Sequence, residues 1–128
     1  MTLIAVYGTL RPGGRAWNAF GLAASMRHVG PARIPGDIVN LGGYPGLIDG
    51  QGEVVGDLLE CLEPAVIDRL DEYEGEGYER VTIRLADPAV DALVWRWTGS
   101  VEGATCVPGN DWANVPVDQQ ADPTESDA

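Results

Sequence analysis

The alternation of apolar and polar residues predicts a chain that combines several strands with one clear helix. Apolar or alternating runs that are typical of strands occupy residues 3–6, 54–62, 78–85 and 92–98. Residues 29–48 are interrupted by eight glycines and prolines, which favours short strands joined by tight turns over a helix. Residues 16–25 are compatible with a helix, although Gly21 lies inside it.

The segment from Pro64 to Glu74 has the clearest helical periodicity in the chain. A proline is tolerated in the first turn of a helix, and Gly75 follows where helices commonly end. At about 100° per residue, the apolar residues of this segment form one stripe: Val66, Ile67, Leu70 and Tyr73. The stripe predicts a helix with one face packed against a core.

Glu74 is the one acid of this helix that falls within the apolar stripe. It lies at about 80° from Val66, between Leu70 and Ile67. A carboxylate taken out of water without a partner is costly or has a raised pKa, so it is kept either for an ion pair or for chemistry. Three structural alternatives stay open at this stage. The helix end frays and turns Glu74 outward, Glu74 caps a backbone amide, or it pairs with an arginine such as Arg80.

The turn after the first strand, Tyr7-Gly8-Thr9-Leu10, is the second candidate site. Gly8 permits backbone torsions that other residues avoid, so that consecutive amide groups can converge on one point. Converging amides form a concavity that suits a carboxylate or another anion. The alternative is a plain tight turn. A dinucleotide-binding loop is excluded, because the GxGxxG pattern is absent.

The charge of the chain excludes several classes of function. The net charge is −12, and all eight basic residues are arginines. Without lysine, the chain lacks the phosphate-binding lysine of a P-loop and the lysine that carries pyridoxal phosphate. An acidic surface also disfavours a nucleic-acid partner, because the phosphate backbone would be repelled.

The remaining candidate residues predict neither a metal site nor a disulfide. Cys61 and Cys106 form no CxxC pair, and His28 is the single histidine, so no metal-ligand spacing is present. We interpret both cysteines as buried thiols and His28 as a strand or loop residue. Trp95 and Trp97 share one face of a strand, and we expect them in the core or in a cavity wall.

The length and the composition predict one domain followed by a tail. Residues 1–112 suffice for a single core, whereas residues 113–128 carry four acids, no base and no aromatic residue, so we expect a disordered tail. No apolar run reaches the roughly 20 residues that span a bilayer, and the N-terminus does not look like a signal peptide. We therefore expect a cytoplasmic protein without a membrane partner.

Four motifs, taken together and in order, resemble a known family. Residues 6–13, VYGTLRPG, resemble the YGTL or YGSL signature of the γ-glutamylcyclotransferase-like family, which includes the AIG2-like proteins. Residues 70–80, LDEYEGEGYER, look like the LDxYEGxxYxR segment of that family. Residues 43–47 and 55–58 are similar to its YPGL turn and to the strand that follows the turn.

The resemblance implies a fold and a set of site residues. The fold would be α+β, a small, mostly antiparallel β-barrel with flanking helices and a reaction cavity. Glu74 corresponds to the catalytic glutamate of the family. The residues that correspond to the substrate-binding positions are Tyr7, Gly8, Thr9, Leu10, Tyr44, Pro45 and Tyr78. No cofactor or metal is implied.

The implied activity is the release of 5-oxoproline and a free amine from a γ-glutamyl amine or peptide. Two alternatives remain: a protein that binds a γ-glutamyl or carboxylate ligand without turning it over, and a hydrolase of γ-glutamyl bonds on the same scaffold. Residues 108–112 resemble the Gly-Asp-Trp ending of the family only loosely, and the loops that shape substrate choice are short. Both departures leave the identity of the released amine open.

Overall fold

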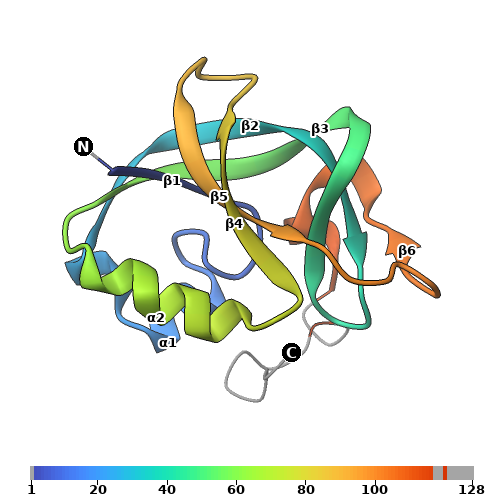
Figure 1. Cartoon of the computed structure of the whole chain (residues 1–128), viewed down its shortest axis with the longest axis horizontal. Coiled ribbons are helices and arrows are strands. Elements are labelled where there is room, and N and C mark those ends of the chain that lie inside the picture. The colour runs from blue at the N-terminus through green and yellow to red at the C-terminus, as the bar shows by residue number, and fades with distance from the viewer. Residues whose placement is uncertain (1, 117–119, 121–128) are drawn as a thin grey trace.

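The computed structural model describes residues 2–116 and 120 (Figure 1). In chain order the elements are β1 (Thr2–Val6), α1 (Arg15–Ala19), the 3-10 turn η1 (Leu22–Ala24), β2 (Met26–Asn40), β3 (Pro45–Cys61), α2 (Ala65–Glu74), β4 (Tyr78–Arg84), β5 (Asp91–Trp97), β6 (Thr105–Cys106) and the 3-10 turns η2 (Pro108–Asn110) and η3 (Trp112–Asn114). The strands predicted at residues 3–6, 78–85 and 92–98 and the helix predicted at 64–74 are confirmed to within one or two residues.

The six strands form one curled sheet in the order β4-β5-β1-β3-β2-β6. All neighbours are antiparallel except β1 and β5, which run parallel. Backbone hydrogen bonds between Arg33 of β2 and residues 86–87, which follow β4, connect the two sides of the curl. Figure 1 shows both helices on the same side of this sheet. The α+β, mostly antiparallel barrel-like fold is therefore confirmed.

The prediction of several short strands over residues 29–48 is wrong. One long strand, β2, continues to Asn40 and pairs with β3 along most of its length, and only the turn at residues 41–44 separates it from the start of β3 at Pro45. The register shifts between His28 and Gly30 and again between Pro35 and Asp37. Because prolines and glycines are tolerated at bulges and on weakly paired edges, they bend β2 without ending it.

The single helix predicted over residues 16–25 is also wrong. Helix α1 ends at Ala19, and Gly21 has a φ of 61°, in the left-handed region that glycine adopts without strain. The chain then continues as the 3-10 turn η1, which buries Leu22.

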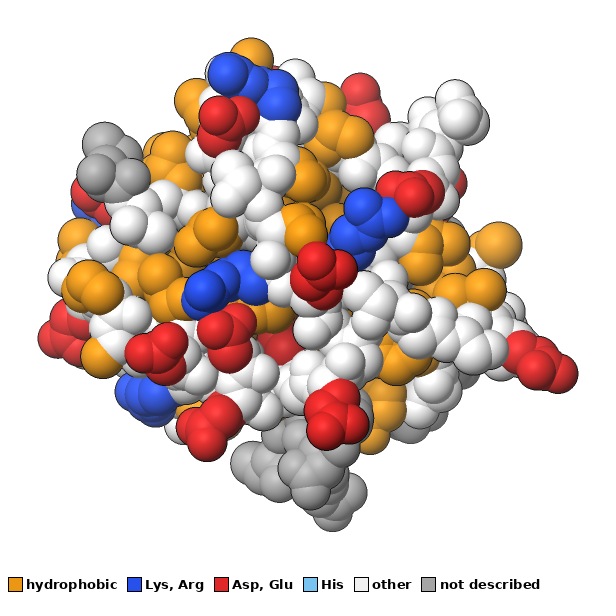
Figure 2. Space-filling model, in the orientation of Figure 1, with side chains coloured by type: hydrophobic (Ala, Val, Ile, Leu, Met, Phe, Trp, Pro, Cys, Tyr) orange, Lys and Arg blue, Asp and Glu red, His pale blue; other side chains and the backbone are white. Residues whose placement is uncertain are grey.

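Two apolar clusters lie on opposite faces of the sheet. Along β1, Ile4 and Val6 pack with Leu70 of α2, whereas Ala5 belongs to the other cluster with Val94 of β5. Both faces of β1 are therefore buried, which explains its unbroken apolar run. On the face drawn in Figure 2, acidic side chains gather around α2, consistent with a solvated outer face of this helix.

The cysteines and the tail differ in part from expectation. The prediction of two buried thiols is wrong, because Cys61 is partly exposed and Cys106 is exposed on the short edge strand β6. Within the predicted tail, Val115 is buried and packs in the core. Residues 117–119 and 121–128, where most of the predicted disorder falls, lie outside the described residues. None of the helices in the described part of the chain is long and apolar enough to cross a membrane.

Candidate active site

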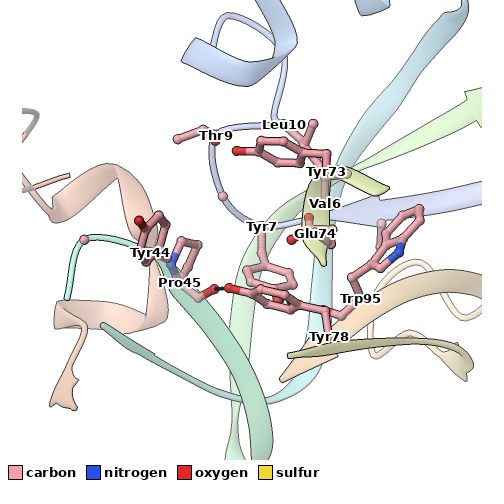
Figure 3. Close-up of a pocket in the computed structure, with 13 residues that line it drawn as sticks. Val6, Tyr7, Thr9, Leu10, Tyr44, Pro45, Tyr73, Glu74, Tyr78 and Trp95 are labelled. Atoms are coloured by element: carbon pink, nitrogen blue, oxygen red, sulfur yellow. Dashed lines mark hydrogen bonds between the residues drawn. The ribbon is translucent and has the colours of Figure 1, made fainter. Parts of the chain in front are cut away.

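One pocket lies where the turn after β1, the end of α2 and the chain before β3 meet (Figure 3). It is lined by Ala5, Val6, Tyr7, Gly8, Thr9, Leu10, Gly43, Tyr44, Pro45, Tyr73, Glu74, Tyr78 and Trp95. All eight residues that the sequence singled out for a site are among them, although they come from four separate segments of the chain. The structure thus brings these residues together, while their individual roles stay predictions.

The carboxylate of Glu74 faces this pocket from the last position of α2. The helix does not fray before it, because Gly75 donates its amide to the Asp71 carbonyl at 3.1 Å and closes the last turn. Arg80 bonds to Asp71, at 2.8 Å, and not to Glu74. Within residues 2–116 and 120, the Glu74 carboxylate forms no hydrogen bond or ion pair. None of the three structural alternatives for Glu74 is therefore realised.

The surroundings of Glu74 change its acidity. Burial of the carboxylate, and secondarily the charge of Asp71, raises the pKa of Glu74 from 4.5 to about 8. A group with a pKa near the operating pH can both accept and donate a proton. This is the property that a general acid–base residue requires.

The turn after β1 offers unused amide donors beside this carboxylate. The Gly8 carbonyl accepts from Arg11 at 3.1 Å, and the Thr9 carbonyl accepts from Ala16 and Trp17 of α1 at 3.1 and 3.0 Å. By contrast, the amides of residues 8–10 donate to no backbone oxygen in the described part of the chain. Buried or partly buried amides normally have a hydrogen-bond partner. Because these three have none on the backbone, they are available to a bound ligand.

A close contact between Gly8 and Pro45 also requires a glycine at position 8. A Cβ atom placed on Gly8 would lie 2.7 Å from Cγ of Pro45, below any normal contact distance. Any larger residue would therefore push the turn away from the other wall of the pocket. This requirement ties two sequence motifs, the signature turn and the YPGL turn, to one another.

Two tyrosines form walls whose hydroxyl groups are already used. Tyr7 donates to the Trp95 carbonyl at 2.6 Å and accepts from the Leu47 amide at 3.2 Å. Tyr78 donates to the Pro45 carbonyl at 2.7 Å, and its ring meets Trp97 edge to face. Burial raises the pKa of both tyrosines well above the ordinary value, so both remain neutral. They shape the pocket and do not carry its charge.

An ion-pair network behind the turn was not found from the sequence. Arg11 bonds to Asp57 of β3 at 2.7 Å and to Asp111 at 2.9 Å, and His28 lies 2.9 Å from the other oxygen of Asp57. Asp111 also caps η3 by accepting from the Ala113 amide. The sequence signal was the Asp-Trp pair at residues 111–112, which resembled the ending of the family loosely. His28 lies on a strand, as predicted.

Two further residues at or beside the site were interpreted differently from the sequence, and a third was expected there. Tyr73 was placed in the apolar stripe of the helix, but its ring lines the pocket and meets Phe20 edge to face at 5.0 Å. Asp71 falls outside the apolar stripe of the helix, but it accepts a hydrogen bond from Nε1 of Trp95 at 2.8 Å. Trp95 is buried and forms part of the cavity wall, as expected.

Solved structures with this fold cover most of the chain. The crystal structure of the uncharacterized protein PH0828 from Pyrococcus horikoshii has a TM-score of 0.74 at 24% identity, over 90% of this chain and 92% of that chain. The solution structure of protein ytfP from Escherichia coli has a TM-score of 0.69 at 26% identity, over 87% and 96%. An aig2-like protein from Mus musculus has a TM-score of 0.63 at 19% identity, over 99% and 91%.

Sequence comparison gives the family. A comparison with curated proteins found no match. Residues 4–114 match the family described as gamma-glutamyl cyclotransferase, AIG2-like. This range contains every strand and helix except the first residues of β1. The chain therefore belongs to the gamma-glutamyl cyclotransferase, AIG2-like family.

Proposed function

We propose that this protein is a cofactor-independent γ-glutamylcyclotransferase-type enzyme. Its substrate is a γ-glutamyl amine or peptide, and its products are 5-oxoproline and a free amine. One observation carries the proposal: an unpaired Glu74 carboxylate with a raised pKa shares a pocket with the unused amides of the turn at residues 8–10. We also propose that the reaction takes place in the cytoplasm.

The reaction is an intramolecular aminolysis. The α-amine of the γ-glutamyl group attacks its own γ-carbonyl carbon, a new C–N bond closes a five-membered ring, and the old amide C–N bond breaks. The attacking nitrogen loses two protons, and the departing nitrogen gains two and leaves as an ammonium ion. Because both reacting groups belong to one molecule, holding the bent conformer supplies much of the acceleration; effective molarities of such reactions reach about 10⁵–10⁸ M.

Glu74 is the group that moves these protons. As a carboxylate it accepts a proton from the substrate ammonium, which frees the nitrogen lone pair for attack. As a carboxylic acid it returns a proton to the departing nitrogen. A positioned acid–base group typically contributes about 10²–10⁴-fold to the rate.

The turn at residues 8–10 holds the other end of the substrate. Its free amides suit the α-carboxylate of the γ-glutamyl group. Because the turn binds the carboxylate, the neighbouring α-amine remains free to attack the γ-carbonyl carbon. The net charge of −12 repels anionic ligands in general, so a local set of amide donors is needed for this carboxylate. We expect the tyrosine walls to limit the access of water to the bound substrate, which would favour cyclisation over hydrolysis.

Incubation with a set of γ-glutamyl amines, followed by product analysis, tests the proposal. Release of 5-oxoproline supports it, whereas free glutamate would identify a hydrolase, and substrate recovered unchanged would identify a binding protein. Glu74→Gln is expected to lower kcat by about 10²–10⁴-fold. Glu72→Gln is the matched control, because Glu72 is exposed on the same helix and its loss should leave kcat unchanged.

A further inference from the structure

Asp71 joins three elements next to the pocket. It lies on α2 three residues before Glu74, so the two carboxylates share one side of the helix. Its Oδ1 accepts from Nε1 of Trp95 on β5, and its Oδ2 accepts from the guanidinium of Arg80 on β4, both at 2.8 Å. With both oxygens engaged, the Asp71 carboxylate has a fixed position although its side chain is 39% exposed.

Trp95 connects this arrangement to the pocket. Its side chain is buried, it lines the pocket, and its carbonyl accepts the hydroxyl of Tyr7. Its indole N–H would lack a partner without Asp71, and a buried donor without a partner is costly. Asp71 therefore fixes Trp95, which forms a wall of the pocket, and also places a negative charge beside the pocket.

Within residues 2–116 and 120, Asp71 is the charged side chain that acts on Glu74. The other titratable groups that line the pocket are tyrosines: Tyr7 directly after β1, Tyr44 before β3, Tyr73 on α2 and Tyr78 on β4. The positive charge of Arg80 faces Asp71 from β4 and offsets part of its field. From the sign of its charge, we expect Arg80 to act on Glu74 in the opposite direction to Asp71.

We propose that Asp71 is a positioning residue for Glu74. Anchored by Trp95 and Arg80, it holds one negative charge at a set distance from Glu74 and makes Glu74 keep its proton to higher pH. Arg80 limits this effect, so that Glu74 still releases its proton in the range where an enzyme works. The inference rests on the acid–base function proposed for Glu74, but its main test needs no turnover.

The test is a pH titration of Glu74 in the full chain. The titration is monitored by the ¹³C chemical shift of the Glu74 carboxyl carbon, and the signal is assigned by its loss in Glu74→Gln. Asp71→Asn should lower the titration midpoint by at least about 0.5 pH unit, the effect of one charge at about 6 Å in water-like surroundings. Arg80→Gln should raise the midpoint, since Asp71 then loses its counter-charge. A general loss of packing would not produce shifts of opposite sign.

Two matched controls remove equal charges elsewhere. Asp68→Asn removes an exposed acid from the first turn of α2, and Arg84→Gln removes an exposed arginine of β4 that pairs with Asp91. Both should leave the midpoint of Glu74 in place. An unchanged midpoint in Asp71→Asn, or a lowered one in Arg80→Gln, overturns the proposal.

The variants differ in their risk of unfolding. Should Asp71→Asn lose its tertiary structure, as judged by near-ultraviolet circular dichroism, Arg80→Gln decides alone, because it changes a side chain that is 37% exposed. Where γ-glutamyl substrates are turned over, the acidic limb of kcat/KM should move to lower pH in Asp71→Asn and to higher pH in Arg80→Gln. Absence of turnover would refute the proposed function and leave the titration result standing.

Discussion

Arg80 directs its guanidinium to Asp71, at 2.8 Å, and Glu74, three residues further along α2, has no ion pair with any residue that the structure describes. The sequence allowed the opposite pairing, since both acids lie within reach of β4. The difference matters because a salt bridge to Glu74 would lower its pKa, whereas burial without one raises it to about 8. The choice of partner thus decides in which direction the pKa of Glu74 departs from its ordinary value.

The first prediction concerns stability. Between pH 4.5 and about 8, folded Glu74 keeps a proton that the unfolded chain has released. Its contribution to the free energy of unfolding is therefore fully present below the unfolded pKa and is lost as the pH rises through the folded pKa. Glu74→Gln cannot ionise, so near pH 9 it should be more stable than the wild type by about 2–4 kcal/mol.

Urea unfolding of both proteins at several pH values measures this difference. The stability gap should widen as the pH rises from about 4.5 to about 8 and stay constant above that, and Glu72→Gln should show no such trend. A gap that stays constant with pH would contradict the raised pKa of Glu74.

The second prediction concerns the pH dependence of catalysis. The proposed mechanism requires Glu74 to accept a proton first, so kcat/KM for a γ-glutamyl amine should rise with pH and approach a plateau above about 8. The profile is measured with one substrate in buffers of constant ionic strength. A rate that is already maximal at the ordinary pKa of a glutamate would show that Glu74 is not the titrating base.

The third prediction concerns the closeness of the two turns. Gly8→Ala introduces a methyl group 2.7 Å from Cγ of Pro45, which should displace the turn and lower kcat/KM by about 10–100-fold. Pro45→Ala removes the clashing atom, so the double variant Gly8→Ala/Pro45→Ala should recover part of that loss. Strictly additive losses in the double-mutant cycle would show that the two residues do not interact in this way.

The fourth prediction concerns the anchor behind the turn. Arg11→Met removes the partner of both Asp57 and Asp111, and it should lower the free energy of unfolding by about 1–3 kcal/mol and raise KM. Arg27→Met is the control, because Arg27 is 57% exposed and its pair with Glu60 should be worth less than about 1 kcal/mol. If chemical denaturation showed that Arg11→Met and Arg27→Met lower the free energy of unfolding equally, the prediction for Arg11 would be wrong.

Local features of this protein were determined by its sequence alone. The apolar stripe of α2, with Glu74 inside it, follows from the helical repeat, and the strand alternation of β5 follows from its pleat. Both patterns depend on residues a few positions apart, so they can be read without knowledge of the fold. Four ordered motifs likewise identified the family that residues 4–114 match.

Local patterns failed where distant pairing competes with them. The glycines and prolines of β2 suggested several short strands, but pairing with β3 carries the strand through two register shifts. At residues 16–25 the failure was of the opposite kind, because Gly21 takes up a left-handed conformation that stops the helix. In both cases the apolar pattern indicated the correct type of element. The ends of the element were set by strand pairing in β2 and by the backbone conformation of Gly21 after α1.

The tertiary structure alone decided which groups meet. The turn at residues 8–10, the end of α2 and Pro45 share a pocket because the curl of the sheet brings together chain segments that are distant in sequence. The pairing of Asp71 with Trp95 and Arg80 depends in turn on the positions of β4 and β5 relative to the helix. Hydrogen bonds and ion pairs need atoms within a few ångströms, and no repeat along the chain encodes such distances between elements.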